Sequence, residues 1–169
     1  IDHCRMGRAG VCATIGKGDK CVLRRADMDA LPVKEESGLE FASATDLSHA
    51  CGHDFHAAAL LGAAKILKAH EAELPGTVKL IFQSGEEVFK GAAGAIRNGV
   101  MENPHVDAAF ATHVFAANPL KNVLYGKYFC ASVYGFRIRV QGKGAHGSSP
   151  ENGVDPLVGG ANILLALQE

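Results

Sequence analysis

The sequence predicts an α/β fold, with a mostly parallel sheet and flanking helices, followed by the start of a smaller α+β domain. Two observations lead to this class. Strand-like and helix-like segments alternate between residues 10 and 114, as they do where helices join the strands of a parallel sheet. After about residue 118 the pattern changes to alternating apolar and polar residues, which is typical of half-exposed antiparallel strands.

The first predicted elements are two strands at residues 10–15 and 20–25, joined by a short Gly- and Asp-containing turn. This pattern predicts a β-hairpin. The second strand runs on into Asp27 and Asp29, whose side chains share one side of an extended segment. Residues 54–71 combine high helix propensity with a repeating apolar pattern, so they predict a helix.

Three further elements follow a Pro-Gly turn. Residues 77–83 predict a buried strand, and residues 91–99 predict a short Ala-rich helix that ends at a glycine. Residues 106–114 form another apolar segment, with His113 at its end. The order of strands and helices therefore predicts a layered sheet with parallel neighbours.

We expect two domains, the first at residues 1–131 and the beginning of a second at residues 132–169. Residues 134–140 alternate apolar and polar side chains and predict an antiparallel strand. Asp155 and Pro156 then supply an N-cap and a first-turn proline, which predict a helix that runs toward the last residue.

Composition excludes several classes of protein. The net charge is -1, with no basic block, so we expect no nucleic-acid partner. No apolar run reaches the ~18 residues that a membrane span needs, so we expect no membrane partner. The five cysteines have no spacing typical of a disulfide framework. Free thiols indicate a reducing compartment, which predicts a cytoplasmic location.

The most informative segment is His-Ala-Cys-Gly-His-Asp-Phe-His at residues 49–56. Cys51 and His53 form a Cys-x-His pair on a loop that leads into a helix, where the helix dipole and a metal both favour the thiolate. With His49 and His56 alongside, the segment predicts a transition-metal site. The spacing does not decide which of the imidazoles binds.

Two later strand ends add further candidates, Glu86 and Glu87 after residues 77–83, and His113 after the next strand. Sites in α/β sheets lie at the carboxyl ends of strands. Adjacent carboxylates can divide the work, one binding metal and the other taking a proton. Each signal is weak alone, so the convergence of three chain segments carries the prediction.

Asp27, Asp29 and His146 stay open on this reasoning alone. The two aspartates suit either a carboxylate that orients a metal-bound histidine or a polar turn before a proline. His146 lies in a Gly-rich turn, where it is either a surface residue or a donor to a developing oxyanion.

Five segments occur in the order of a known family. They are Arg-Ala-Asp-Met-Asp-Ala-Leu-Pro at 25–32, His-Ala-Cys-Gly-His-Asp at 49–54, Gly-Glu-Glu at 85–87, His113, and Gly-Ala-His-Gly-Ser-Ser-Pro at 144–150. The chain resembles the metal-dependent N-acyl-amino-acid amidohydrolases. These include hippurate hydrolase and the plant auxin-conjugate hydrolases, in the aminoacylase and carboxypeptidase clan.

The resemblance implies that residues 1–131 are a partial metal-binding catalytic domain and that residues 132–169 are the first part of a lid domain. It also implies specific roles for single residues. Cys51, His53, Glu87 and His113 resemble ligands of two divalent ions, which would be zinc, manganese, cobalt or nickel. Glu86 resembles the general base on a metal-activated water, and Asp29 the carboxylate that supports the centre. Asp27 stands where other clan members carry a ligand histidine. His146 resembles the lid residue that stabilises the oxyanion.

The resemblance further implies a small N-acyl amino acid as substrate and a homodimer formed through the lid domain. Family members are about twice as long and carry a final ligand histidine in a segment that this chain does not contain. We therefore expect an incomplete metal site and no activity from this chain alone.

Two other classes compete with this reading. The first is a hydrolase with Cys51 as nucleophile, which leaves Glu86 and Glu87 without a role. The second is a non-catalytic module that binds metal or peptide, although such a module has no need of Glu86.

Overall fold

The computed structural model describes residues 2–5, 10–127 and 130–168. The chain forms two compact units, residues 1–120 and residues 121–169, and each is described by itself. A division into domains at residue 131 stays a prediction.

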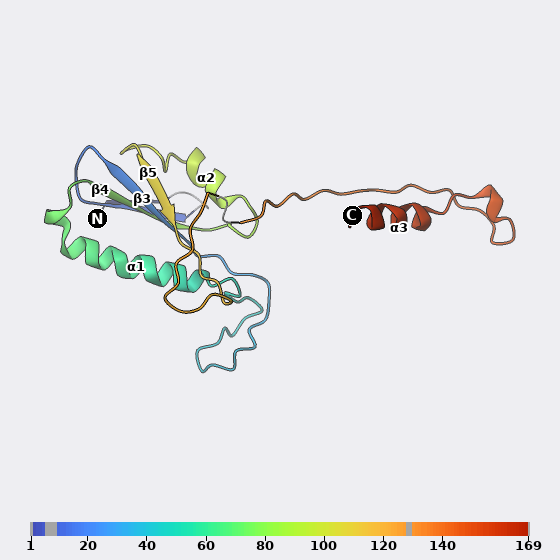
Figure 1. The fold of residues 1–169 in the computed structure, drawn as a ribbon, viewed down its shortest axis with the longest axis horizontal. Coiled ribbons are helices and arrows are strands. Elements are labelled where there is room, and N and C mark those ends of the chain that lie inside the picture. Colours follow the sequence, from blue (N-terminus) through green and yellow to red (C-terminus); the bar gives the residue numbers. More distant parts are fainter. Residues whose placement is uncertain (1, 6–9, 128–129, 169) are drawn as a thin grey trace. The chain divides into compact units, whose positions relative to one another are not determined.

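The first unit contains one five-stranded sheet, in the order β1-β2-β4-β3-β5 (Figure 1). The parallel strands β4, β3 and β5 form one side, while β2 and β1 pair antiparallel beyond β4. The α/β class is confirmed. The strand bounds are β1 (Asp2–Arg5), β2 (Gly10–Ile15), β3 (Cys21–Asp27), β4 (Thr77–Gln83) and β5 (Ala108–Ala111).

The predicted hairpin between the first two strands is wrong, because β4 lies between β2 and β3. Leu80 and Ile81 explain this placement, since both are buried and belong to core clusters on opposite faces of the sheet. A strand that is buried on both faces lies inside the sheet, with a neighbouring strand on each side. The turn from β2 to β3 crosses the start of β4, where a Cβ on Gly16 would lie 2.5 Å from the Gly76 carbonyl oxygen.

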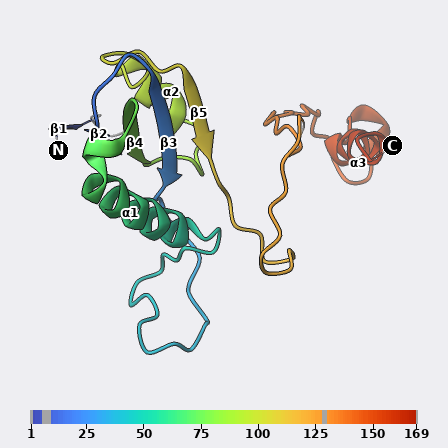
Figure 2. The same ribbon diagram turned by 60° about the vertical axis from the view of Figure 1, so that its left-hand side comes forward.

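Helices α1 (His53–Ala69) and α2 (Gly91–Arg97) cover opposite faces of the sheet (Figures 1 and 2). Under α1 the core contains Leu60 with Leu80, and under α2 it contains Ala95 with Ile81. A 3₁₀ turn, η2 (Glu71–Glu73), leads from α1 toward β4. Both helices begin and end within two residues of the predicted limits.

Strand β5 is shorter than the segment 106–114 that the sequence predicts. After Ala111 the chain leaves the sheet, and the backbone N–H of Val114 donates to His56 in place of a neighbouring strand. This departure brings the end of β5 to the N-terminus of α1. Because β3, β4 and β5 are parallel, their carboxyl ends meet at the same edge of the sheet, where α/β proteins place their sites.

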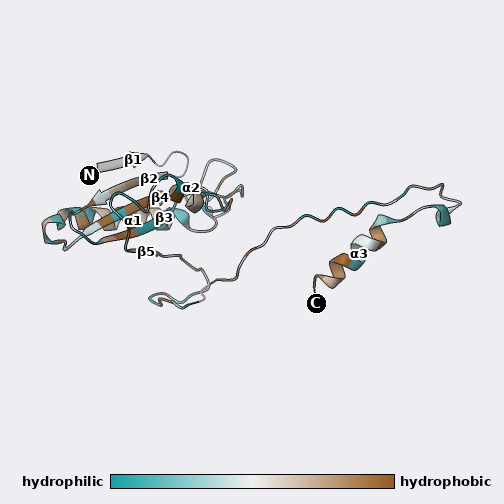
Figure 3. Cartoon of the chain, turned by 90° about the horizontal axis from the view of Figure 1, so that it is seen from above, coloured by the Kyte–Doolittle hydropathy of each residue, from teal (hydrophilic) through white to brown (hydrophobic). Residues whose placement is uncertain are grey.

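In the second unit, helix α3 (Pro156–Ala166) begins as predicted, and the Asp155 carboxylate accepts from the Leu157 N–H. Figure 3 shows that much of α3 is apolar. A 3₁₀ turn, η3 (Pro150–Asn152), precedes it. The predicted strand at 134–140 is wrong, since these residues pair with no strand among those described, and a strand needs a neighbour for its hydrogen bonds.

No helix in the described ranges has both the length and the apolar character needed to cross a membrane.

Candidate metal centre

His53, the first residue of α1, lies at the middle of the candidate site and is fully buried. Its Nδ1 lies 3.0 Å from the backbone carbonyl oxygen of Asp29. A carbonyl oxygen can only accept, so Nδ1 carries the proton and donates. The second nitrogen, Nε2, therefore presents a lone pair, which is the form in which histidine binds a metal.

Three carboxylates surround this lone pair. Nε2 of His53 lies 3.6 Å from Asp27 Oδ2, 3.8 Å from Glu87 Oε1 and 3.9 Å from Glu86 Oε2. These separations exceed hydrogen-bond length. They suit atoms that share one cation, because ligand atoms bound to an ion at about 2.1 Å lie roughly 3–4 Å apart.

Four buried polar atoms at this place have no hydrogen-bond partner: Asp27 Oδ2, Asp29 Oδ1, His53 Nε2 and Glu87 Oε1. Asp27 Oδ2 is 2.7 Å from Arg25 Nη1 as an ion pair, but without hydrogen-bond alignment. A buried unsatisfied polar atom costs about 1–3 kcal/mol. His53 Nε2, Asp27 Oδ2 and Glu87 Oε1 lie close together, so a divalent cation fits these three atoms. Asp29 Oδ1 lies instead 3.3 Å from His53 Nδ1, the nitrogen on the other side of the ring.

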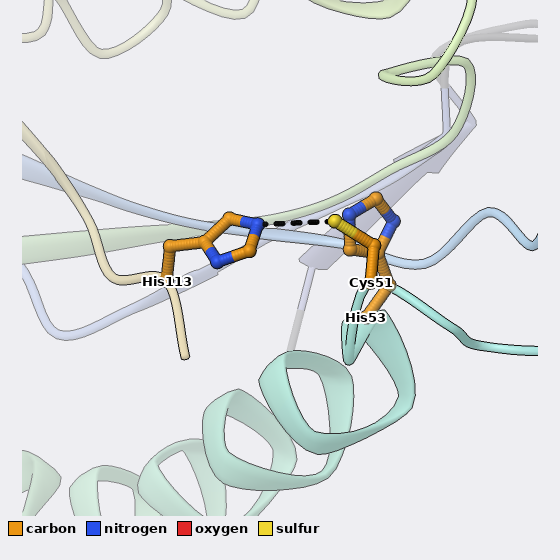
Figure 4. A group of neighbouring side chains, drawn as sticks. All are labelled: Cys51, His53 and His113. Atoms are coloured by element: carbon orange, nitrogen blue, oxygen red, sulfur yellow. Dashed lines mark hydrogen bonds between the residues drawn. The ribbon is translucent and has the colours of Figure 1, made fainter. Parts of the chain in front are cut away.

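Cys51 and His113 supply two more ligand atoms. Figure 4 shows the Cys51 thiol facing the His113 ring, with Sγ 3.5 Å from Nε2. Nδ1 of His113 donates to the Val114 carbonyl oxygen at 2.6 Å, so Nε2 again carries a lone pair. One ligand atom from each of Cys51, His53 and His113 lies within 4.8 Å of the others.

Burial raises the pKa of the Cys51 thiol, and the charges of Glu87, Glu86 and Asp27 raise it further. Without a cation the site therefore favours the neutral thiol. A bound divalent ion reverses this balance, because it stabilises the thiolate directly.

Glu86 and Glu87 follow β4 after a turn in which Gly85 has φ +74. The backbone N–H of Glu87 donates to Asp29 Oδ2 at 3.0 Å. The Glu87 side chain is 21% exposed and turns an oxygen into the centre, while Glu86 is 37% exposed. One carboxylate thus faces the buried atoms and the other is more open to solvent.

His56 is engaged at both ring nitrogens. Nδ1 lies 2.5 Å from Asp27 Oδ1, and Nε2 accepts from the Val114 N–H at 2.9 Å. Burial opposes ionisation of Asp27, yet the His56 hydrogen bond and the Arg25 charge hold its pKa below the usual range. Of the imidazoles in segment 49–56, His53 thus has the free ligand atom. Sequence reasoning missed the Asp27–His56 pair, whose two side chains lie 29 positions apart in the chain.

His49 is exposed and belongs to none of the metal-ligating groups found in the described part of the chain. His146 lies in the second unit, where its Nδ1 is 2.9 Å from Ser148 Oγ and accepts from the Ser148 N–H. Its predicted role at the oxyanion stays a prediction.

Comparisons with known proteins show which family the chain is similar to. The model of a family described as peptidase family M20/M25/M40 matches residues 23–165. An N-acetyl-L-cysteine deacetylase of Bacillus subtilis is 40% identical over 95% of this chain and 39% of its own length. The IAA-amino acid hydrolase ILR1-like 2 of Arabidopsis thaliana is 42% identical, over 95% of this chain and 37% of its own length.

An N-acyl-L-amino acid amidohydrolase of Geobacillus stearothermophilus is 41% identical over 88% of this chain and 40% of its own length. This chain therefore spans about 40% of the curated relatives it matches.

Two solved structures are similar. A Staphylococcus aureus protein described as an aminohydrolase matches with TM-score 0.78 and 36% identity, over 96% of this chain and 44% of its own. The Bacillus subtilis YXEP protein, described as a dinuclear metal binding peptidase, matches with TM-score 0.62 and 42% identity, over 65% of this chain and 31% of its own.

Proposed function

Because this chain belongs to peptidase family M20/M25/M40, we propose that it carries part of the metal centre of an enzyme that hydrolyses the amide bond of N-acyl amino acids or similar small amides. Relatives named as a deacetylase of an N-acetyl amino acid and as an N-acyl-L-amino acid amidohydrolase support this substrate class. The observation that carries the proposal is the close group of three buried atoms without hydrogen-bond partners, His53 Nε2, Asp27 Oδ2 and Glu87 Oε1.

The proposed ligands are Cys51, His53, Glu87 and His113. A set of sulfur, nitrogen and oxygen donors suits zinc, manganese, cobalt or nickel. We propose two ions in the complete site, as in the similar protein described as dinuclear. When bound, such a pair supplies Lewis acidity, which polarises the scissile carbonyl and lowers the pKa of water.

The residues of this chain then divide the remaining work. Glu86, the more open carboxylate, accepts a proton from the attacking water and passes it to the leaving amine. Asp29 holds His53 through its carbonyl and Glu87 through its carboxylate, so it positions both ligands. His146 donates a hydrogen bond to the developing oxyanion.

The cysteine-nucleophile alternative has less support. A nucleophilic cysteine needs a lowered pKa, whereas burial and three carboxylates raise the pKa of Cys51. The alternative of a binding module without catalysis remains as an outcome of the test.

The first experiment is elemental analysis of the purified chain for divalent metals. We expect bound metal in the wild type and its loss in Cys51→Ala/His53→Ala. The matched control is Cys130→Ala/His70→Ala, which removes the same side-chain types at exposed positions and should keep the metal. Equal metal content in both variants would remove the ligand assignment.

Catalysis is tested separately, with N-acyl amino acids and the full-length protein. Glu86→Gln should keep the metal and lose nearly all turnover. Surviving turnover would show that Glu86 is not the base, and bound metal without any turnover in the wild type would favour the binding module.

We also propose a homodimer formed through residues 132–169 and a cytoplasmic location. Exposed apolar side chains in this segment, such as Phe136 and Leu157, support a covered surface there. Cys21, Cys51 and Cys130 are free thiols, which supports a reducing compartment. Analytical ultracentrifugation of the wild type and Phe136→Asp tests the dimer, which the variant should weaken.

A further inference from the structure

A continuous row of polar contacts joins β3 to the proposed ligands Cys51 and His113. It starts at Asp27 Oδ1, which lies 2.5 Å from His56 Nδ1. The opposite nitrogen of His56 accepts from the Val114 N–H, and the Val114 carbonyl accepts from His113 Nδ1 at 2.6 Å. His113 then contacts Cys51 Sγ at 3.5 Å. The peptide groups of Val114 thus connect two imidazoles.

The bonding partners fix the protonation of His56. A backbone N–H can only donate, so Nε2 of His56 must present a lone pair to Val114. The proton of the neutral ring therefore sits on Nδ1, which donates it to Asp27. The ring is 4% exposed, so water does not readily replace either partner.

His56 consequently has no lone pair to offer a metal while both bonds stand, although its ring centroid lies 4.6 Å from that of His113. We propose that His56 is a positioning residue, which fixes the Asp27 carboxylate with one nitrogen and the Val114 peptide that orients His113 with the other. This inference rests on the proposed function, because it assigns His56 to the support of that metal centre.

Two features show why this position needs such support. Residues 112–114 have left the sheet, since β5 ends at Ala111, so no neighbouring strand holds the Val114 N–H. Val114 is also packed closely on Gly52, where an added Cβ would lie 2.5 Å from Val114 Cγ2. The His56 hydrogen bond therefore decides where the peptide beside His113 sits.

Two substitutions separate the two bonds. In His56→Gln the side-chain amide lies near the place of Nε2, so its oxygen can accept from Val114 while the donor to Asp27 is lost. In His56→Asn the amide lies near the place of Nδ1, so the donor to Asp27 is kept and the acceptor for Val114 is lost. His70→Gln is the control, at an exposed histidine.

The readouts are hydrogen exchange of the Val114 amide in the metal-free chain and zinc affinity against a competing chelator. We expect His56→Asn to speed Val114 exchange at least tenfold and to weaken zinc binding ~10–100-fold, the usual effect of losing a group that orients a ligand. His56→Gln should keep Val114 protection and lose less affinity. Equal behaviour of both variants, or unchanged Val114 exchange in His56→Asn, would overturn the proposal.

The ¹⁵N chemical shifts of the wild-type His56 ring supply a test without any substitution. We expect a protonated Nδ1 and an unprotonated Nε2, both unchanged when zinc is added. A large zinc-induced shift at either nitrogen would make His56 a ligand and overturn the proposal. If the wild type binds no metal, the proposed function fails, while the Val114 exchange and the ring protonation still decide the arrangement proposed here.

Discussion

Asp29 joins the ends of two strands, because its Oδ2 accepts a 3.0 Å hydrogen bond from the backbone N–H of Glu87. The same residue accepts from His53 Nδ1 through its backbone carbonyl. One aspartate thus sets the direction of a buried imidazole and of a carboxylate, which come from α1 and from the loop after β4.

Replacement of Asp29 should weaken metal binding through Glu87. Asp29→Ala removes the acceptor for the Glu87 N–H but leaves the backbone bond to His53, so we expect zinc affinity to fall ~10–100-fold. Asp29→Asn should lose less, because its amide oxygen can still accept. Competition with a chelator measures both variants, and Asp19→Ala, in an exposed turn, is the control. Equal losses in the alanine and asparagine variants would contradict this role.

Metal should protect one cysteine from alkylation. Cys51 is partly exposed and Cys130 is exposed, whereas Cys12 and Cys21 are buried. We expect added zinc to slow iodoacetamide labelling of Cys51, because a ligand thiolate is occupied, while labelling of Cys130 stays the same. Mass spectrometry of the labelled peptides measures both sites in one sample. Equal labelling of Cys51 with and without zinc would remove it from the ligand set.

The sequence predicts strands best where burial dominates. The bounds of β4 agree with the predicted segment 77–83, and five of its seven residues are buried. The pairing of β2 with β4 instead of β3 could not be predicted, because it depends on which strand fills the centre of the sheet. The segment 134–140 shows the same limit: alternation describes a strand but supplies no partner.

In the site, too, some contacts could be predicted from the sequence and others could not. Parallel strands bring their carboxyl ends together, so the meeting of Cys51 with His113, 62 positions apart, follows from the predicted topology. The topology does not predict which of His53 and His56 offers a free nitrogen to a metal, because both residues lie near the start of α1. That choice depends on the backbone carbonyl of Asp29 and the backbone N–H of Val114, and no side-chain pattern marks these groups.

Gly52 should tolerate no side chain. Its φ is +80, and an added Cβ would lie 2.5 Å from Val114 Cγ2. Gly52→Ala should therefore pay about 1–2 kcal/mol for the left-handed conformation and about 1–3 kcal/mol more for the overlap. Urea denaturation measures the free energy of unfolding.

Two comparisons separate these costs. Gly38 has φ +69 and open space around it, so Gly38→Ala should show the conformational cost alone. In Gly52→Ala/Val114→Ala the clashing methyl group is gone, so the double variant should be less destabilised than the sum of the two single variants, and this coupling measures the overlap cost. Simple additivity of the two effects would contradict the contact.

Lys79 is a buried cation within β4, only 2% exposed. Its Nζ donates to the backbone carbonyls of Val100, Glu102 and Pro104 at 2.8–3.0 Å. Lys79→Met keeps the apolar stem but leaves three carbonyls without this donor, so we expect a loss of about 3 kcal/mol. Lys65→Met, on the exposed side of α1, should change unfolding by less than about 0.5 kcal/mol. A similar effect of both substitutions in urea would contradict the role of Lys79.

The ion pair between Lys20 and Asp107 predicts a dependence of stability on pH. The hydrogen bond from Lys20 Nζ, followed by that from the Cys21 N–H, holds the pKa of Asp107 below its usual value. A carboxyl whose pKa is lower in the folded state contributes stability above its unfolded pKa of about 3.9. That contribution is lost as the pH falls through the lower folded pKa.

Asp107→Asn removes the titrating group and keeps one oxygen for the Cys21 N–H. The variant should therefore be less stable than the wild type at pH 7, and the difference should shrink as the pH falls below about 4. Other acids with lowered pKa, such as Glu71, occur in both proteins and cancel from the difference. Urea denaturation at pH 7 and at pH 3 gives the two differences. A gap of the same size at both pH values would mean that Asp107 acts through its hydrogen bonds alone, and that its charge contributes no stability.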